Sequence, residues 1–442
     1  MSQTVTRRDD RSVVPRPRLD LRQLDGSDRR VGVVGLGYVG LPTALALAAA
    51  GHSVTGVDTS RERLAAIAAG DVDLLPQDHD RLNRHSRDAS VVTSDDLSLL
   101  AGMDVVMICV PTPVDHHQTP DLATLRAACR AVVSNACQGQ VIILTSTSYA
   151  GCTRDMLIDP LTARGLSVGL DVHVAFSPER IDPANSEFPT DRVTRVVGGA
   201  TEACTRRAAS ILARVVPTVH SVSTPEAAEL TKLYENTFRA VNIALANEMA
   251  DVATSLGVAP MEIVTAAATK PFGFLPFSPG PGVGGHCIPC DPHYLLWQLR
   301  AKRLRTPLIE EAMAGIAGRP NRVVERATEV LAATGRALTG SRVLVHGVAY
   351  KPGVADVRES PALEILSRLE GRGAATDYYD SRVPELHIGG VRLQSIERPS
   401  GAGHDLVIVH TVHPQDDTSW LQGVSLLLDA TYRLGLSQAH LV

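Results

Sequence analysis

Residues 31–40 read VGVVGLGYVG, and this short stretch decides how the first part of the chain folds. Gly35, Gly37 and Gly40 stand in GxGxxG spacing between an apolar, β-branched run and an Ala/Leu-rich run. In a strand–loop–helix unit, the first glycine allows a tight turn, the second lets the backbone approach a pyrophosphate, and the third lets the helix pack closely on the strand. The helix N-terminus adds N–H groups and a positive dipole. The motif therefore predicts a dinucleotide-binding loop, and an ordinary glycine-rich turn is the alternative.

The next apolar run, SVTGVD, ends in Asp58, where a carboxylate would accept a hydrogen bond from the ribose 2′-OH of a dinucleotide. The same carboxylate would repel the 2′-phosphate of NADP, so we expect NAD as the cofactor. Tyr38 and Val39 of the loop, together with Arg63 after the second strand, complete the expected cofactor site. A membrane span over residues 31–51 is the competing interpretation, but the glycines and the proline of this stretch have loop spacing, which favours strand, loop and helix.

Strand-like and helix-like runs alternate on both sides of the chain's centre. In the first half, the β-branched runs RVGVVGLG, SVTGVD, DVVMICVP, QVIILTSTS, DVHVAFSP and TRVVGG alternate with Ala/Leu-rich runs, as is typical of a parallel sheet wrapped by helices. A long helix is then expected to start at Pro225 and stop at Gly257, and strands resume near Arg342. The expected fold class is α/β, with two Rossmann-like, doubly wound domains joined by a central helical domain built on the long helix.

These changes divide the chain into a disordered N-terminal extension (1–28), a dinucleotide-binding domain (29–222), a central helical domain (223–335) and a C-terminal Rossmann-like domain (336–442). The extension is rich in arginine, but acidic residues are interspersed and no apolar run follows it. We therefore expect no targeting signal in it.

The composition excludes several classes of function. The 442 residues carry a formal net charge of −5, and no basic block or aromatic-interleaved run of arginines occurs, so no nucleic-acid partner is expected. Seven scattered cysteines, an odd number, indicate a reducing compartment rather than a disulfide framework. We expect a cytoplasmic protein that does not associate with membranes.

Two of the expected strands end in turns that contain hydroxyl groups, and one of these turns also contains two prolines. VPTP spans residues 110–113 and TSTS spans residues 145–148. Because α/β sheets bind ligands outside the carboxyl ends of parallel strands, we include Pro111, Thr112 and Thr147 in the expected cofactor site. Ordinary hydroxylated turns would look the same in sequence.

The loop PGPGVGGHCIPCDP, residues 279–292, contains His286, Cys287 and Cys290, and His293 follows. It admits three interpretations: half of a metal site, a buried structural loop, or the seat of a nucleophilic cysteine. No second CxxC is present to close a zinc tetrahedron, so no metal is expected. A buried cysteine is the usual finding. A nicotinamide site elsewhere in the chain and a polar pair on the long helix nevertheless favour a nucleophile.

That polar pair is Lys232 and Asn236, which lie four residues apart and therefore on one face of the expected helix. An ammonium and an amide together could hold a developing oxyanion. A lysine that extends to the surface is the alternative.

Five segments in order carry a resemblance: GLGYVGLP, FSPERIDPAN, AELTKLYENT, PGPGVGGHCIPCDP and GVAYKPGVADVRESPA. Over about residues 30–435 the chain resembles the UDP-glucose/GDP-mannose dehydrogenase family, and within it the branch that acts on UDP-N-acetylhexosamines. The resemblance implies NAD-dependent, four-electron oxidation of the C6 hydroxymethyl group of UDP-GlcNAc or UDP-ManNAc to the uronate, through a cysteine thiohemiacetal and thioester. It also implies that the C-terminal domain binds the UDP-sugar and that the central domain carries the catalytic cysteine loop.

The resemblance also implies a role for individual residues. Cys287 would be the nucleophile, whereas Cys290 stands where the family more often has an aliphatic residue and would only pack. The other implied catalytic residues are Lys232 and Asn236 (oxyanion stabilisation), Asp291 (positioning or activating water), Glu179 (proton transfer and thioester hydrolysis) and Thr147 (holding water). The implied substrate contacts are Glu179, Arg180, Lys232, Asn236, Pro279, Gly280, Gly282, Gly284 and Lys351, and Arg358 would reach the cofactor or a phosphate across the interdomain cleft.

The chain departs from the family at residues 316–320, where IAGRP stands in place of a segment like INDxMP. The family's contacts in this segment are therefore not transferred, although Arg319 could substitute for them. Three functional alternatives stay open: UDP-glucose or another nucleotide hexose as substrate, a catalytically silent nucleotide-sugar-binding subunit, and a simple two-electron dehydrogenase. NADH formation with a panel of UDP-sugars would separate them.

The long helix also bears on assembly. It presents apolar residues on more than one side: Leu230, Leu233, Phe238, Val241, Leu245, Met249 and Val252. A helix that is apolar on several sides must be buried on several sides. We expect a homodimer, or a higher homo-oligomer, formed around this helix.

Overall fold

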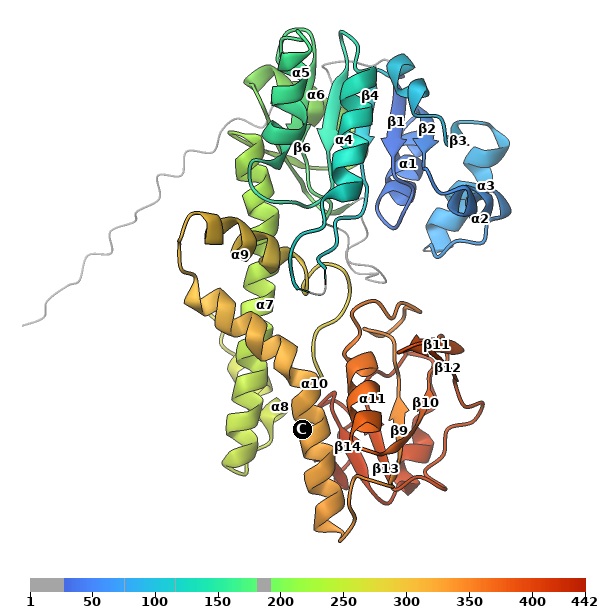
Figure 1. Cartoon of the computed structure of the whole chain (residues 1–442), viewed down its shortest axis with the longest axis vertical. Coiled ribbons are helices and arrows are strands. Elements are labelled where there is room, and N and C mark those ends of the chain that lie inside the picture. Colours follow the sequence, from blue (N-terminus) through green and yellow to red (C-terminus); the bar gives the residue numbers. More distant parts are fainter. Residues whose placement is uncertain (1–27, 75, 116, 181–191) are drawn as a thin grey trace, which may run out of the picture.

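The computed structural model describes residues 28–74, 76–115, 117–180 and 192–442. The expected disordered extension lies outside the described residues, apart from Asp28. Two α/β units lie at opposite ends of the molecule, and the long helix α7 (Pro225–Ser255) runs beside both of them (Figure 1). The α/β fold class with a central helical connection is confirmed.

The N-terminal unit is built on an eight-stranded sheet with the order β3-β2-β1-β4-β5-β6-β7-β8. The strands are β1 (Arg30–Val34), β2 (Ser53–Val57), β3 (Val91–Ser94), β4 (Val105–Ile108), β5 (Val141–Leu144), β6 (His173–Phe176), β7 (Arg195–Gly199) and β8 (Val219–Val222). Every neighbouring pair is parallel except β6 and β7, which are antiparallel. The expected parallel sheet is therefore confirmed, with one antiparallel pair that the sequence did not indicate.

Helices cover both faces of this sheet because its strands are apolar on both sides. Val106 and Ile108 of β4 pack in one core, whereas Val105 and Met107 pack in the other, as the two-residue period of a strand requires. The helices of this unit are α1 (Gly40–Ala49), α2 (Arg61–Ala69), α3 (Pro76–Arg87), α4 (Ala123–Asn135), α5 (Asp159–Ala163) and α6 (Glu202–Leu212). The unit is doubly wound, as predicted.

The central part contains α7 and three further helices: α8 (Pro260–Ala268), α9 (Asp291–Ala301) and α10 (Pro307–Ala333). The Thr224 side chain accepts a hydrogen bond from the Ala227 N–H and caps α7, which confirms the predicted helix start. Helix α10 contains a proline, Pro320, in its interior. Burial of Ile316, Pro320 and Val323 against neighbouring elements offsets the lost backbone hydrogen bond.

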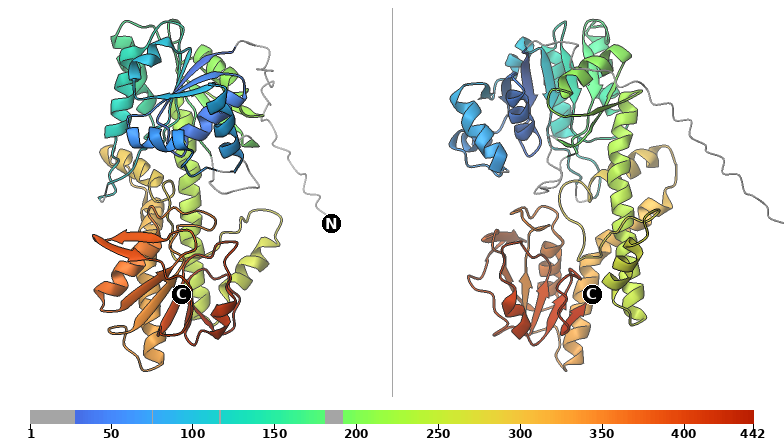
Figure 2. Two further views of the ribbon diagram at one scale, coloured as in Figure 1. Left: turned by 90° about the vertical axis from the view of Figure 1, so that its right-hand side faces the viewer. Right: turned by 180° about the vertical axis from the view of Figure 1, so that it is seen from behind.

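The C-terminal unit has a parallel five-stranded sheet with the order β10-β9-β13-β14-β15, beside the antiparallel pair β11-β12. Its elements are β9 (Arg342–His346), α11 (Pro361–Gly371), β10 (Ala375–Tyr379), β11 (Glu385–Ile388), β12 (Val391–Gln394), β13 (Leu406–Val409), β14 (Leu427–Asp429) and β15 (Ala439–Leu441). Helices α10 and α11 cover one face of the sheet, and a short 3₁₀ helix (Ser419–Gly423) covers part of the other. Figure 2 shows this unit below the N-terminal unit in both views.

The apolar stretch after Arg30 forms β1, a loop and α1, as the strand–loop–helix interpretation predicts. Among the described residues, no helix combines the length and the apolarity that a membrane crossing requires.

Candidate active site

A cleft of about 1520 Å³ lies where the two α/β units and the central helices meet. Its walls come from the glycine loop and strand ends of the N-terminal unit, from α7 and the loop before α9, and from turns of the C-terminal unit. A site for one small ligand usually occupies roughly 300–1,000 Å³. The cleft therefore has room for more than one small molecule.

The glycine loop has the geometry that its spacing predicts. Gly35 has φ +87°, which favours glycine, and a Cβ built on Gly40 would lie 1.8 Å from the Gly35 carbonyl oxygen. A Cβ on Gly37 would meet no atom within 4 Å, and Gly37 lines the cleft. Val39 precedes α1 without a side-chain cap, and the positive end of this helix dipole follows the glycine loop directly. The N–H groups of Leu41 and Thr43 donate to the Gly37 and Val39 carbonyl oxygens at 3.2 and 3.1 Å, and Pro42 has no N–H.

Asp58 anchors this loop through hydrogen bonds to its backbone. Its carboxylate accepts hydrogen bonds from the Leu36 N–H (2.8 Å) and the Ser60 N–H (2.9 Å). Arg63 donates through Nε to the Leu36 carbonyl oxygen at 2.9 Å. A carboxylate has about four acceptor positions, so Asp58 retains capacity for a ribose hydroxyl. The residues present at this loop fit a dinucleotide.

The two cysteines in the loop before α9 differ in their exposure to solvent. Cys290 is only 3% exposed, and burial raises the pKa of its thiol to about 12. Cys287 opens into the cleft, although protein surrounds it on most sides. This burial and the nearby Asp291 carboxylate raise the pKa of Cys287, whereas Lys232 and two arginines oppose the rise. Among the described residues, no group of three or more His, Cys, Asp or Glu side chains is placed to hold a metal ion.

Three polar side chains line the cleft together with Cys287. Lys232 is 8% exposed, so it does not extend to the surface as the alternative interpretation supposed. Asn236 donates through Nδ2 to Asp291 Oδ2. Burial raises the pKa of Asp291 to about 6, although Lys232 and the Asn236 hydrogen bond both act to lower it. The cleft therefore brings a thiol, an ammonium, an amide and a carboxyl group together.

Glu179 follows β6 of the N-terminal sheet and lines the cleft. Its carboxylate pairs with the buried Arg195 guanidinium at 2.5 Å. Arg180 pairs with Glu235 of α7 at 2.6 Å and donates to the Thr194 carbonyl oxygen at 2.9 Å. Arg195 was not predicted from the sequence, although a charged residue at the start of a buried strand is an unusual feature that could have marked it.

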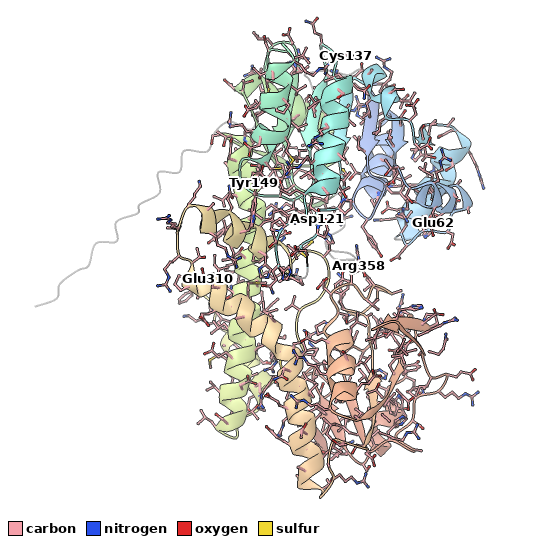
Figure 3. All side chains as sticks on the ribbon, viewed as in Figure 1. Glu62, Asp121, Cys137, Tyr149, Glu310 and Arg358 are labelled. Atoms are coloured by element: carbon pink, nitrogen blue, oxygen red, sulfur yellow. The ribbon has the colours of Figure 1, made fainter. Side chains whose placement is uncertain are left out.

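The C-terminal unit reaches the cleft through the turn after β9. The Arg358 guanidinium carbon lies 4.7 Å from the centre of the Tyr38 ring, so a turn of one unit stacks on the glycine loop of the other. Arg358 also pairs with Asp356 at 2.6 Å. Figure 3 labels Arg358 between the upper and lower units. Lys351 lines the cleft from the same turn.

Three family models match the chain in order. They describe the NAD binding domain (residues 29–216), the central domain (residues 226–315) and the UDP binding domain (residues 344–431) of the UDP-glucose/GDP-mannose dehydrogenase family. The chain belongs to this family. It is an NAD-dependent nucleotide-sugar dehydrogenase, with the cofactor expected from the glycine loop.

Relatives from the predicted branch are similar over nearly their whole length. The chain is 34% identical over 397 residues to the UDP-N-acetyl-D-mannosamine dehydrogenase of Pyrococcus horikoshii, covering 87% of this chain and 90% of that protein. It is 30% identical over 393 residues to a UDP-N-acetyl-D-glucosamine 6-dehydrogenase of Pseudomonas aeruginosa, covering 88% and 91%. A solved structure of UDP-D-ManNAc dehydrogenase from Pyrococcus horikoshii matches with a TM-score of 0.84 and 31% identity, covering 91% of this chain and 95% of the other.

Most of the residues predicted for the dehydrogenase's site line this one cleft: Gly37, Tyr38, Val39, Pro111, Thr112, Thr147, Glu179, Arg180, Lys232, Asn236, Pro279, Gly280, Gly282, Gly284, Cys287, Asp291, Lys351 and Arg358. Four predicted cofactor residues are not part of this lining: Gly35, Gly40, Asp58 and Arg63. Asp58 and Arg63 instead form hydrogen bonds with the backbone of Leu36 in the glycine loop. The cleft also contains Arg239, His410, Thr431 and Arg433, which were not predicted. Thr431 and Arg433 follow β14, so the strand-end rule applied to the last sheet would have pointed to them.

Proposed function

We propose that this dehydrogenase oxidises the C6 hydroxymethyl group of a UDP-N-acetylhexosamine, UDP-GlcNAc or UDP-ManNAc, to the uronate in two successive two-electron steps. The observation that carries the proposal is the position of Cys287, which opens into the same cleft as the glycine loop. A dehydrogenase that stops at the aldehyde has no need of a nucleophile in that position.

When bound along the glycine loop, NAD⁺ supplies the hydride acceptor for each oxidation. The Cys287 thiolate adds to the C6 aldehyde, which forms an S–C bond and a thiohemiacetal. Oxidation of the thiohemiacetal gives a thioester. Water then cleaves the S–C bond, which releases the carboxylate and returns the thiol. Lys232 and Asn236 line the cleft with Cys287, and each can donate a hydrogen bond to the oxygen on C6, which carries negative charge in these intermediates.

The hydrolysis step needs a group that orients water. Asp291 adjoins Cys287, because the Asp291 N–H donates to the Cys287 carbonyl oxygen at 2.8 Å. Its carboxyl group, with a pKa raised to about 6, is ionised at neutral pH and can accept a proton from water. Glu179 and Thr147 line the same cleft from the N-terminal unit, and we assign them to proton transfer and to holding water.

The preference for an acetamido sugar is supported by the family branch of the relatives and by the loop PGPGVGGHCIPCDP. The experiment is NADH formation with UDP-GlcNAc, UDP-ManNAc and UDP-glucose at equal concentrations. We expect two NADH per sugar and the highest kcat/KM with an acetamido sugar. A ratio near one would refute the cysteine-bound route. Higher activity with UDP-glucose would refute the substrate and leave the chemistry intact.

We also propose a homodimer built on α7. One side of this helix leaves a row of apolar side chains exposed, which we call the α7 stripe: Leu230, Tyr234, Phe238, Leu245, Met249 and Val252 are each at least 41% exposed. Leu233, which the sequence also placed among the apolar residues of this helix, is instead buried within its own chain. A contiguous apolar row of this length is typical of an interface. We further propose a cytoplasmic location and domain limits at residues 222/223 and 335/336.

A further inference from the structure

Arg319 of α10 is a buried cation outside the proposed chemistry. It is 3% exposed. Its guanidinium donates through Nε to the Gly280 carbonyl oxygen at 3.0 Å and through one terminal nitrogen to both Asp251 oxygens at 2.8 and 3.0 Å. The other terminal nitrogen donates to the Tyr432 hydroxyl. One side chain thus joins the cysteine loop, α7 and the C-terminal unit.

The first of these partners lies in the wall of the cleft. Gly280 lines it, and both of its backbone groups are fixed by buried side chains: the N–H donates to Asn247 Oδ1 at 2.9 Å, and the carbonyl accepts from Arg319. The loop then passes directly against the C-terminal unit, since a Cβ on Gly282 would lie 2.8 Å from Pro361. The position of Gly280 therefore constrains the path of the loop toward Cys287.

The last partner belongs to the C-terminal unit. Tyr432 is 5% exposed and has φ +60°, a strained conformation for a residue other than glycine. Its hydroxyl donates to the Val442 carbonyl oxygen and accepts from Arg319. Its chain neighbours, Thr431 and Arg433, both line the cleft. A change in the position of Tyr432 would therefore move two residues of the nucleotide side of the site.

We propose that Arg319 is a positioning residue that fixes the cysteine loop and the nucleotide side of the cleft relative to each other. It thereby sets the distance between Cys287 and the reacting carbon of a sugar held by its nucleotide. This inference rests on the proposed function. An arginine suits the role because its planar guanidinium donates in several fixed directions at once, which an ammonium cannot reproduce.

The test compares Tyr432→Phe and Arg319→Lys with a matched control, Arg326→Lys. Arg326 lies seven residues further along the same side of α10 and also ties this helix to the C-terminal unit, through the Leu441 carbonyl oxygen at 2.8 Å. Like Arg319 it does not line the cleft, but its hydrogen bonds, to Leu441 and Glu329, do not reach the cysteine loop as those of Arg319 do. Misplacement of reacting groups by about 1 Å can lower a rate by two orders of magnitude. We expect kcat to fall about tenfold or more in both test variants, while KM for the UDP-sugar and Kd for UDP in calorimetry stay within about twofold. The control should match wild type in all three.

A second measurement does not depend on turnover. Amide hydrogen exchange should become faster in Tyr432→Phe both in the loop around residues 280–287 and around residues 431–433, and in neither segment in Arg326→Lys. Faster exchange near residue 432 alone would overturn the inference, as would an unchanged kcat in an active enzyme. A wild-type chain that is inactive with every nucleotide sugar would instead refute the proposed function, and the exchange measurement would still decide the coupling. Should Arg319→Lys fail to fold, Tyr432→Phe removes only a hydroxyl group and still gives the answer.

Discussion

At the scale of single residues, surroundings rather than chemical identity distinguish the two cysteines of the loop. Cys290 is enclosed, and burial keeps its pKa near 12. Cys287 lies open to the cleft and close to Lys232, Arg239 and Arg358, whose charges favour the thiolate against the effect of burial. Only the second environment suits a nucleophile.

Replacement of each cysteine separates these roles. Cys287→Ser should lower NADH formation at least about a thousandfold, because an alkoxide is far harder to generate than a thiolate. Cys290→Ala should keep kcat within about threefold of wild type and lower Tm by a few degrees, since it removes a buried sulfur from a packed loop. The opposite order of effects would show that the nucleophile has been misassigned.

Asp291 predicts a pH dependence of activity. Its raised pKa of about 6 means that the carboxyl group becomes neutral as the pH falls through this value, and it can then no longer accept a proton from water. The kcat of the complete reaction should therefore fall below about pH 6. In Asp291→Asn, kcat should be low at every pH and the inflection near pH 6 should be absent. An inflection that persists in the variant would assign the acid limb to another group.

The same carboxyl group predicts a pH dependence of stability with the opposite sense. In an unfolded chain the pKa of an aspartate is about 3.9, which is below the value of about 6 in the folded chain. The folded state therefore binds the proton more readily, and the group disfavours folding increasingly as the pH rises from about 4 to 6. Asp291→Asn should raise Tm more at pH 8 than at pH 4.5. Equal Tm changes at both values would contradict the raised pKa.

The sequence identified the residues that sit in local motifs and missed those held by distant partners. Cys287, Lys232 and Asn236 belong to short segments whose spacing already indicates chemistry. Arg195 pairs with Glu179 from another strand. Arg319 was noticed only as a departure from the family, because its partners Asp251 and Tyr432 lie 68 and 113 residues away. No local pattern contains such a contact.

At the scale of elements, the glycine loop offers a matched pair of substitutions. In Gly40→Ala the new Cβ would lie 1.8 Å from the Gly35 carbonyl oxygen, so the loop must shift and both Tm and NAD affinity should fall. In Gly37→Ala the methyl group enters open space on the cleft wall, so Tm should match wild type while KM for NAD rises about tenfold. Normal NAD binding by Gly37→Ala would place the dinucleotide away from this loop.

The elements themselves were predictable where their apolar runs are long or fully buried. All six quoted strand runs of the first half form strands, and α7 starts at Pro225, as expected. The short strands β3 and β8 were missed because each exposes part of its length, which weakens the apolar signal. The continuation of α10 through Pro320 could not be read locally, because tertiary packing overrides the preference of proline to begin a helix.

At the scale of the whole molecule, the α7 stripe predicts the oligomeric state. Leu245 is 54% exposed in a single chain, so Leu245→Arg should leave the folded protomer intact and disrupt a dimer formed through this row. Light scattering should give twice the 47.0 kDa of one chain for wild type and a lower mass for the variant.

Leu170→Arg is the control for this experiment, because Leu170 is 83% exposed but lies on the N-terminal unit, outside the stripe. It should leave the mass unchanged. A fully active wild-type monomer would refute the dimer, and a loss of mass in the control would show a general effect of added charge.

The reversal of β7 has a consequence for the layout of the molecule. Ala175 pairs with Gly199 and Phe176 with Gly198, and the same antiparallel register, continued along the chain, sets residue 179 opposite residue 195. Because β7 runs opposite to β6, its first residue, Arg195, lies at the edge of the sheet where β6 ends, and there it pairs with Glu179. In a uniformly parallel sheet, this edge would contain only the last residues of strands.

Since β8 follows β7 in the same sense, the chain also leaves the sheet at the edge remote from the cleft. Helix α7 must then travel back along the whole height of the sheet before it reaches the C-terminal unit (Figure 1). Its 31 residues, at about 1.5 Å each, cover that distance. On the way it carries Lys232 and Asn236 past Cys287, so the direction of one strand determines both the reach of the helix and which of its turns faces the substrate.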